Sequence, residues 1–279
     1  MKQGILYIVA TPIGNRSDMS QRAIDILSQV NLIAAEDTRH SRHLLDYFNI
    51  KTRMIAYHDH NEEQKTPVIV DKLLAGEDIA LISDAGTPLM SDPGYRLVKA
   101  ARDAGLQVSP VPGACAAIAA LSVSGMPTDQ FYFAGFSPAR SGARKIFFES
   151  LRQQQATLVF YESSHRIAAS LRDMVAVFGA DRSAVVAREL TKAFETVQMD
   201  RLEDLADWVD MDANQRKGEF VVLVEGVAAR TDDIDAHAEH VLGVLMAELP
   251  LKQASQLASA ITGIKKNKLY KLALEKNSN

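Results

Sequence analysis

The chain has 279 residues, of which 47% are hydrophobic and 24% charged, and its formal net charge is −4. This composition is typical of a globular protein with a substantial core, and the length favours two domains. The longest nearly apolar run, 114–123, is about half the length of a membrane helix, and the single Cys115 excludes an internal disulfide and fits a reducing cytosol. We therefore expect a cytoplasmic protein without a membrane segment.

In the first part of the chain, strand patterns alternate with helical patterns from Ile5 to about Ser124. The predicted strands lie near 5–10, 31–35, 52–57, 78–83 and 106–111, and the predicted helices near 20–29, 38–48, 61–75, 94–104 and 114–123. This alternation predicts a mostly parallel sheet with helices on both faces. Thr38 is the predicted N-cap of the second helix, and Asn61 with Gln64 predicts a capping box for the third.

The segment 124–129 interrupts this alternation and is the predicted hinge. Further strands are predicted near 130–136, 156–161, 183–189, 193–199 and 219–225, with helices near 140–155, 164–178 and 201–210. The runs 183–190 and 193–199 are close enough to form a hairpin, so this second sheet is predicted to be mixed. After an acidic stretch at 231–235, two helices around Gly263 are compatible with a helix-turn-helix unit. We therefore expect an α/β chain of three domains: 1–124, 125–228 and 229–279.

One stretch, residues 79–94 with the sequence IALISDAGTPLMSDPG, is especially informative. It predicts a buried strand that ends in a Gly/Pro/Asp loop before a helix, the place where α/β sheets bind ligands. The junctions 8–14 and 108–115 have the same construction, so the three loops are predicted to share one pocket, unless they are plain turns. No G-x-G-x-x-G follows a predicted strand and no P-loop motif occurs, which argues against ordinary dinucleotide and triphosphate sites.

Charged and aromatic residues gather where predicted strands end. Glu36 and Asp37 suit the start of a helix, and a cationic cluster that begins with Arg39 follows them, as for a polyanionic substrate or a plain surface helix. In the second part, Tyr161 is suited to stacking on a base and Arg166 to binding phosphate. Structural ion pairs would account for the same charges.

The C-terminal region is rich in lysine, with five Lys between 264 and 276 against one Glu. Such a basic end can contact a polyanion locally, and a solvated helix face is the alternative. The His pairs in the chain lack further ligands at persuasive spacing, so no metal site is expected. Without a G-x-S-x-G elbow, and with Cys115 among alanines, covalent hydrolase chemistry has little support.

Seven motifs together resemble a known family. They are TPIGN (11–15), AAEDTR (34–39), SDAGTPLMSDPG (83–94), VPG (111–113), FYESSHR (160–166), ARELTK (187–192) and KGE (217–219). In this order they resemble the bacterial 16S rRNA cytidine 2′-O-methyltransferases of the tetrapyrrole-methylase superfamily. The resemblance implies two α/β domains with S-adenosylmethionine in the cleft between them, a homodimer, and methylation of cytidine 1402 in the small ribosomal subunit.

The resemblance also implies which residues bind the cofactor. They are Pro12, Gly14, Asp84, Ala85, Gly86, Thr87, Pro112, Gly113, Ala114, Cys115, Tyr161, Leu190, Gly218 and Glu219. The chain departs from many superfamily members at Cys115 and Ala116, where a small hydroxyl residue is usual after VPG.

A 2′-hydroxyl is a weak nucleophile while protonated, so a general base would accelerate the reaction by about a hundredfold to ten-thousandfold. Glu189 is the first candidate, followed by Lys192 and His165, and no metal is required. The predicted RNA contacts are Glu36, Asp37, Arg39, Arg166, Lys265, Lys266 and Lys268. Two other functions stay open: methylation of a small tetrapyrrole, and a non-catalytic module that binds nucleotide or RNA.

Overall fold

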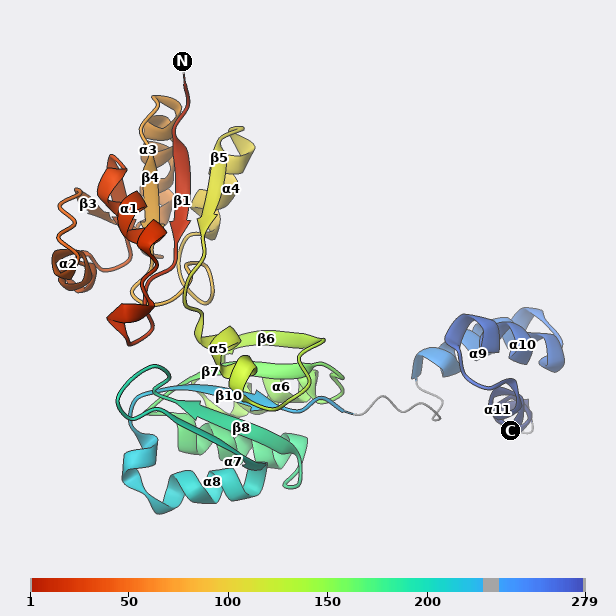
Figure 1. Ribbon diagram of the computed structural model, residues 1–279. Coiled ribbons are helices and arrows are strands. Elements are labelled where there is room, and N and C mark those ends of the chain that lie inside the picture. The colour runs from red at the N-terminus through yellow and green to blue at the C-terminus, as the bar shows by residue number, and fades with distance from the viewer. Residues whose placement is uncertain (1, 228–235, 278–279) are drawn as a thin grey trace. The chain divides into compact units, whose positions relative to one another are not determined.

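The computed structural model describes residues 2–227 and 236–277 (Figure 1). The chain divides into two compact units, Met1–Val227 and Ala228–Asn279. The larger unit contains two five-stranded sheets and the smaller one is helical. None of the described helices combines the length and the apolar character needed to span a membrane.

The first sheet is entirely parallel, with strand order β3-β2-β4-β1-β5. Its strands are β1 (Ile5–Val9), β2 (Leu32–Ala35), β3 (Met54–Ala56), β4 (Ile79–Ile82) and β5 (Gln107–Val111). Every residue of β2 and β4 is buried, as expected for central strands covered on both faces. The flanking helices are α1 (Gln21–Gln29), α2 (Thr38–Tyr47), α3 (Glu62–Leu74) and α4 (Tyr95–Asp103), with the short 3₁₀ helix η1 (Arg16–Asp18).

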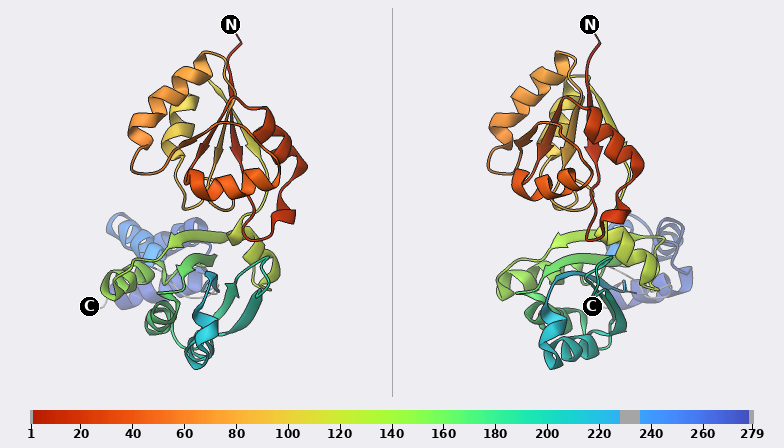
Figure 2. Two further views of the ribbon diagram at one scale, coloured as in Figure 1. Left: turned by 90° about the vertical axis from the view of Figure 1, so that its left-hand side faces the viewer. Right: turned by 60° about the vertical axis from the view of Figure 1, so that its left-hand side comes forward.

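Helices cover both faces of this sheet, which confirms the predicted architecture (Figure 2). Side chains of α1 and α2, such as Leu27 and Leu45, pack with Ile33 on one face. Those of α3 and α4, such as Leu73 and Leu97, pack on the other face. All ten predicted elements of this half are present, with ends that differ by at most about two residues.

Two predicted helix caps are wrong. Asp37, and not Thr38, is the N-cap of α2, because its Oδ1 accepts the N–H groups of Arg39 at 2.8 Å and His40 at 3.4 Å. Asn61 precedes α3 but makes no side-chain cap, because its Oδ1 accepts the N–H of His58 at 3.0 Å instead. Both misses reflect a choice among local hydrogen-bond partners that sequence spacing does not decide.

The second sheet is mixed, as predicted, with strand order β6-β7-β10-β8-β9. Its strands are β6 (Phe131–Phe136), β7 (Thr157–Ser163), β8 (Ser183–Arg188), β9 (Thr196–Arg201) and β10 (Glu219–Val224). Only β6 and β7 pair in parallel, and β8 and β9 form the expected hairpin. The helices are α6 (Ser141–Leu151), α7 (Ile167–Phe178) and α8 (Leu202–Met211), with the 3₁₀ helix η2 (Ala213–Arg216).

The two faces of the second sheet are covered by different parts of the chain. Helices α6, α7 and α8 bury one face around Phe148 and Phe160. The other face packs against α5 (Ala116–Val123), whose Ala117, Ala120 and Leu121 are buried with strand residues of that sheet. The chain therefore passes from the first sheet to the second before α5, ahead of the predicted hinge at 124–129. The predicted division into three domains stays a prediction.

The smaller unit is built from α9 (Ala236–Glu248), α10 (Leu251–Thr262) and α11 (Lys266–Asn277). Leu242, Ala258 and Leu269 lie in its common core. Gly263 ends α10 with a φ of +73°, the left-handed conformation typical of a helix C-terminus, so the predicted glycine turn is present. The acidic stretch 231–235 lies outside the described residues.

Candidate active site

Three loops at the carboxyl ends of the first sheet are hydrogen-bonded to one another. Thr11, after β1, exchanges two backbone hydrogen bonds with Gly86, after β4, at 2.9 and 3.0 Å. The hydroxyl of Thr87 donates to the carbonyl of Ala114, after β5, at 2.9 Å. Gly86 has a φ of +82°, and a Cβ on it would lie 3.3 Å from the side chain of Ile13, so glycine suits this close approach.

A cavity of about 410 Å³ is lined by these loops and by the second sheet. The first sheet and α5 contribute Ile13, Glu36, Asp84, Ala85, Gly86, Thr87, Met90, Asp92 and Ala116. The second sheet and its turns contribute Phe136, Tyr161, Glu162, Ser163, Ser164, Ala187, Leu190, Lys192, Gly218, Glu219, Phe220 and Val221. Its volume lies in the range of small-molecule sites, and both halves of the larger unit are needed to form it.

Three carboxylates, Glu36, Asp84 and Asp92, line the first-sheet side, and we call them the acidic wall. Two backbone N–H groups bind these carboxylates: the N–H of Asp37 donates to Asp84 Oδ1 at 3.0 Å, and the N–H of Asp84 donates to Glu36 Oε2 at 3.3 Å. Burial raises the pKa of Glu36; the N–H of Asp84 opposes this rise, and the charges of Asp84 and Asp59 add to it.

Asp92 has the most strongly perturbed carboxyl of the acidic wall. Burial raises the pKa of Asp92 from its ordinary 3.8 to about 6; the Ser83 hydroxyl opposes the rise, while the charges of Glu36, Asp84 and Asp59 add to it. Asp92 lies in the loop of the stretch 79–94 but is not among the site residues predicted from the sequence. Its motif, S-D-P-G, gives only a turn signal, because the charges that act on it come from other strand ends.

Tyr161 on β7 forms an aromatic surface on the second-sheet side. Its hydroxyl accepts the N–H of Ala117 at 3.2 Å, and its ring meets Phe133 and Phe136 edge-on with centroids 5.0 and 5.6 Å apart. Burial raises the pKa of Tyr161, and the neighbouring Cys115 adds to the effect, so the phenol stays neutral at physiological pH. Tyr161 is therefore a fixed, uncharged part of the wall.

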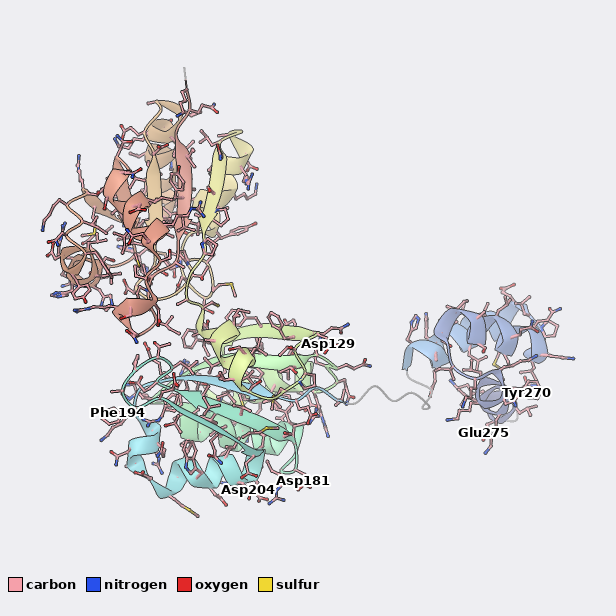
Figure 3. The ribbon with its side chains drawn as sticks, viewed as in Figure 1. Asp129, Asp181, Phe194, Asp204, Tyr270 and Glu275 are labelled. Atoms are coloured by element: carbon pink, nitrogen blue, oxygen red, sulfur yellow. The ribbon has the colours of Figure 1, made fainter. Side chains whose placement is uncertain are left out.

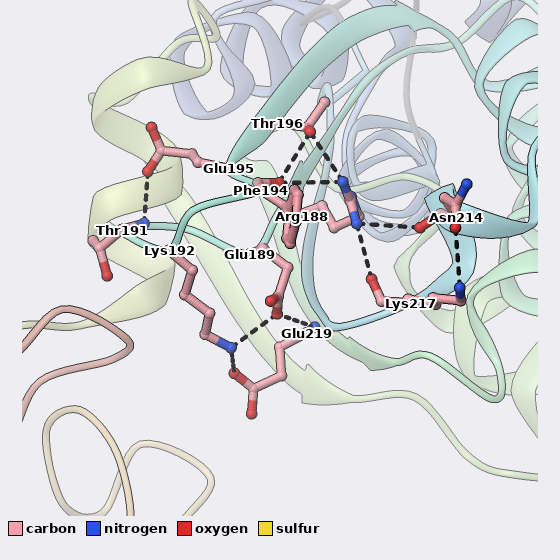
Figure 4. Close-up of polar contacts among 10 residues, drawn as sticks. All are labelled: Arg188, Glu189, Thr191, Lys192, Phe194, Glu195, Thr196, Asn214, Lys217 and Glu219. Carbon is pink, nitrogen blue, oxygen red and sulfur yellow. Dashed lines mark hydrogen bonds and ion pairs between the residues drawn. The ribbon is translucent and has the colours of Figure 1, made fainter.

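Lys192 lies between two carboxylates, Glu189 and Glu219, and we call these three residues the lysine trio (Figure 4). Its Nζ lies 2.8 Å from Glu189 Oε1 and 2.7 Å from Glu219 Oε2, and Glu189 Oε1 also accepts the N–H of Glu219 at 3.0 Å. Burial would raise the pKa of Glu189, but these hydrogen bonds outweigh it and the pKa is lowered. Burial would likewise lower the pKa of Lys192, but its two carboxylate partners raise it.

Glycine at two positions permits this arrangement. A Cβ on Gly218, whose φ is +98°, would collide with the carboxyl group of Glu189. A Cβ on Gly14, in the loop after β1, would collide with the methylene chain of Lys192. The side chain of Lys192 therefore packs against the loop after β1. The backbone on either side of Leu190 is left-handed, with φ of +51° at Glu189 and +64° at Thr191.

A second hollow, of about 310 Å³, shares Ile13, Asp84, Ala85, Lys192 and Glu219 with the cavity. Its other lining residues are Pro12, Gly14, Arg16, His40, Ser41, His43, Leu44 and Ser83. Arg16 lines it together with the imidazole rings of His40 and His43. Phe194, 73% exposed, lies on the β8–β9 connection that also carries Lys192 (Figure 3).

The structure brings together most of the predicted cofactor residues. Those that line the cavity are Asp84, Ala85, Gly86, Thr87, Tyr161, Leu190, Gly218 and Glu219, and Pro12 and Gly14 line the second hollow. Pro112, Gly113, Ala114 and Cys115 line neither; Ala114 holds Thr87, and Cys115 lies beside Tyr161. The cavity residues missed in the sequence include Ile13, Met90, Phe136 and Phe220, which gave only core or turn signals.

The other predicted residues lie in varied settings. Glu36 lines the cavity, whereas Arg39 is 91% exposed at its side chain and pairs with Asp37 at 3.3 Å. Arg166 pairs with the buried Glu162 at 3.0 Å, and His165 is exposed and lines neither hollow. Lys265, Lys266 and Lys268 belong to the smaller unit.

The described residues contain no group of three or more His, Cys, Asp or Glu arranged to hold a metal ion. The expectation of metal-free chemistry stays a prediction, because this finding concerns protein ligands alone.

Comparison with known proteins shows similarity over nearly the whole chain. A family profile described as Tetrapyrrole (Corrin/Porphyrin) Methylases matches residues 5–206, and one described as the RsmI C-terminal HTH domain matches 232–277. "Ribosomal RNA small subunit methyltransferase I" of Escherichia coli O157:H7 is 54% identical, covering 98% of this chain and 96% of its own length. The protein of the same name from Pseudomonas aeruginosa PAO1 is 51% identical and covers 99% of both chains.

Solved structures support the fold assignment. The uroporphyrin-III C-methyltransferase of Thermus thermophilus has a TM-score of 0.57 at 20% identity, over 80% of this chain and 94% of that one. The methyltransferase CobJ has a TM-score of 0.59 at 17% identity, over 81% and 96%. At this low sequence identity, the solved structures show the fold alone, whereas the full-length relatives show the family. The chain belongs to the tetrapyrrole methylase family, within its group of ribosomal RNA small subunit methyltransferase I proteins.

Proposed function

We propose that the protein is an S-adenosylmethionine-dependent methyltransferase that methylates the ribose 2′-hydroxyl of cytidine 1402 in 16S rRNA. The observation that carries this proposal is the similarity of the whole chain, C-terminal unit included, to relatives named for small-subunit rRNA methylation. A tetrapyrrole methylase profile alone would leave the substrate open. From this substrate we also infer a cytoplasmic location.

The residues of the cavity fit S-adenosylmethionine. Its acidic wall repels phosphate groups, which disfavours nucleoside triphosphates and favours a ligand with a positive charge. Tyr161, Leu190 and Val221 supply aromatic and apolar surface for an adenosine, and the loop Asp84–Thr87 lines the opposite side of the cavity. When bound, S-adenosylmethionine supplies an electrophilic methyl group on a sulfonium centre.

The main task of the protein in this reaction is positioning. Holding two reactants in line contributes about 7–11 kcal/mol, provided that the groups holding them are themselves fixed. The hydrogen bonds among Thr11, Gly86, Thr87 and Ala114 fix the first-sheet loops, and the lysine trio fixes the turns that carry Leu190 and Glu219. The base roles of Glu189, Lys192 and His165 stay predictions.

The second hollow supports a polyanionic acceptor. Arg16 lines it beside the cavity, together with His40 and His43, and arginine is a usual contact of an RNA backbone. Arg39, in the first turn of α2, and Phe194, on the β8–β9 connection, are exposed and are available to phosphate and to an unstacked base, respectively. A 2′-hydroxyl target distinguishes RNA from DNA.

A homodimer is also part of the proposal. Strand β6 lies at one edge of its sheet and exposes Phe131 and Tyr132, and α5 exposes Ile118 and Val123. Exposed apolar side chains next to an open sheet edge are typical of an interface. Sedimentation at micromolar concentration tests this, with twice the chain mass expected and the single chain mass contradicting it.

The function is tested with S-adenosylmethionine carrying a tritiated methyl group. The protein is given 30S subunits that lack the modification, free 16S rRNA, or a porphyrin precursor, and the label is located by nuclease mapping and chromatography. Label at the ribose of cytidine 1402 supports the proposal, whereas label on the porphyrin precursor or no transfer at all contradicts it. We expect binding to RNA to weaken steeply with salt, since Arg39, Lys265, Lys266 and Lys268 would contact phosphate.

A further inference from the structure

Asp92 is held at the cavity by a strained loop. The backbone is left-handed at Leu89, Ser91 and Gly94, with φ of +74°, +69° and +130°, and two of the residues between them, Met90 and Asp92, line the cavity. Left-handed backbone at non-glycine residues costs about 1–3 kcal/mol each and persists only where surrounding packing imposes it.

The packing that holds this loop comes from the core. The Leu89 side chain packs against the buried cluster around Leu81, and a Cβ on Gly94 would lie 2.6 Å from Leu81. The loop therefore has little freedom to withdraw Asp92 from the cavity.

The Asp92 carboxylate differs from its neighbours in its partners. Glu36 and Asp84 each accept a backbone N–H, whereas none of the described residues donates an N–H to Asp92. The groups that act on it are Ser83 and Asp84 from the end of β4, Glu36 after β2 and Asp59 after β3, and on the second sheet it acts on Tyr161. Lys192 lines the same cavity but is held by Glu189 and Glu219.

Of the other candidate bases, Glu189 and Lys192 are engaged with each other, and His165 lines neither hollow. Glu189 accepts two hydrogen bonds and its pKa is lowered, and the pKa of Lys192 is raised, so both favour their charged forms. Glu162 lines the cavity but is paired with Arg166 and accepts the hydroxyl of Ser137. A general base needs an accessible lone pair within reach of the reacting hydroxyl, and Asp92 offers one.

We propose that Asp92 is the general base that accepts the proton of the acceptor hydroxyl during methyl transfer. This inference rests on the proposed function and names a catalytic residue for it. As the new carbon–oxygen bond forms, the carbon–sulfur bond of the donor breaks with its electron pair on sulfur, and the hydroxyl proton passes to Asp92 Oδ. The positive charge of the sulfonium and the negative charge of the carboxylate disappear together, so the step is balanced without another reactant.

The acidity of Asp92 suits this role. A carboxyl with a pKa of about 6 is mostly ionised at pH 7, and it is a stronger base than an ordinary aspartate. The low polarity that raises its pKa also favours neutralisation of charge in the transfer step.

The experiment compares the full-length wild type with Asp92→Asn and Asp92→Glu. Single-turnover methylation of 30S subunits is measured from pH 5 to 9 at saturating S-adenosylmethionine, and donor affinity is measured by calorimetry. Carboxyl NMR of the donor-free protein follows the titration of Asp92 independently of activity. Asp103→Asn is the matched control, because Asp103 is an exposed carboxylate on α4 that pairs with Lys99.

We expect the wild-type rate to rise with pH as Asp92 ionises and then to reach a plateau; the bound sulfonium should move this rise below the pKa of about 6 of the donor-free protein. Asp92→Asn should lower the single-turnover rate at high pH by about a hundredfold or more and abolish its increase with pH. The Kd for the donor should change less than about threefold. Asp92→Glu should restore part of the rate together with its pH dependence, and the NMR signal near pH 6 should be absent from Asp92→Asn alone. The rate and pH profile of Asp103→Asn should match the wild type.

Two results would overturn the assignment. One is an Asp92→Asn rate near that of the wild type. The other is a rate loss fully explained by weaker donor binding, which would make Asp92 a partner of the sulfonium and not a base. If the wild type itself leaves 30S subunits unlabelled, the proposed function fails first, and that outcome is visible without any variant.

Discussion

The acidic wall and the lysine trio both bring carboxylates to one cavity, yet their acidities shift in opposite directions. In the acidic wall, Glu36 and Asp92 are half-buried beside other negative charges, and the pKa of each is raised. In the lysine trio, Glu189 is held by Lys192 and a backbone N–H, and its pKa is lowered. The residue type is nearly the same, and the neighbours decide the chemistry.

This difference separates two tasks within the site. A carboxylate with a raised pKa accepts a proton readily near neutral pH, whereas one held by a lysine is a fixed anion that orders its loop. We therefore interpret the first-sheet side as the reactive one and the second-sheet side as the positioning one. The following substitutions test that division, starting with the largest expected effect.

Substitution of Gly218 by Ala should disrupt the lysine trio most severely. The new Cβ would occupy the position of the Glu189 carboxyl group, so Glu189 and Lys192 must move. Displacement of positioning groups by about 1 Å costs on the order of a hundredfold in rate, and we expect such a loss of single-turnover rate together with weaker donor binding, measured by calorimetry.

Gly179→Ala is the matched control for Gly218→Ala. Gly179 has a similar φ, +101° against +98°, but a Cβ there meets nothing within 4 Å. Both variants should lose about 1–3 kcal/mol of stability to backbone strain, and only Gly218→Ala should lose activity. Equal activities would show that the lysine trio does not position the site.

Substitution of Lys192 by Met removes the cation of the lysine trio, so the carboxylates on both sides of the cavity lack a cationic partner among the described residues. Glu189 keeps its burial but loses its strongest partner, so its pKa should rise. Loss of a hydrogen bond to a charged group costs about 1.5–3 kcal/mol of stability, and the donor Kd should weaken because the turns that carry Leu190 and Glu219 lose their link. Lys72→Met, which breaks an ion pair with Glu77 outside both hollows, should leave that Kd unchanged.

The sequence predicted the fold more fully than the site. Strands β2 and β4 are uninterrupted apolar runs between turn residues, so their burial could be inferred from the chain alone. The packing of α5 on the second sheet could not, because its small apolar residues suit either sheet. Local periodicity shows that a helix exists, and the partner of that helix is a property of the whole fold.

The same limit applies to the site residues. Asp84 and Gly86 stand in a motif that marks a ligand loop, and they line the cavity as the resemblance implied. Asp92 lies in the same motif, but its acidity depends on Glu36 and Asp59, which follow other strands. The charge environment of a residue is set by side chains far away in sequence, so the motif identified the loop and not its most reactive group.

Substitution of Asp92 by Asn should stabilise the protein at neutral and alkaline pH. The pKa of Asp92 is higher in the folded protein, about 6, than its ordinary 3.8, so folding favours the protonated form. Its contribution to stability is complete below pH 4 and is lost as the pH rises through 6, which corresponds to at most about 3 kcal/mol. Denaturant unfolding should thus show Asp92→Asn to be the more stable protein at pH 8, with little difference at pH 4.

For Glu189→Gln we expect the opposite change in the free energy of unfolding at pH 8. The lowered pKa of Glu189 means that its charge supports the fold above its ordinary pKa, so removal of that charge should destabilise the protein at pH 8 and matter less in acid. The same sign for both variants would remove the distinction between the acidic wall and the lysine trio.

The smallest expected effect belongs to Asp59→Asn. Asp59 is exposed and lines neither hollow, but its charge raises the pKa of both Glu36 and Asp92. Removal of that charge should lower the pKa of Asp92, so the rising part of the pH–rate profile moves to lower pH while the level at high pH is unchanged. Removal of the single charge of Asp59 predicts a rate increase of about twofold at pH 5.5. The difference between the variant and the wild type should fade in about 1 M salt, because salt screens the charge. A profile that does not move, or that moves to higher pH, would mean that the titrating group lies beyond the field of Asp59 and is not in the acidic wall.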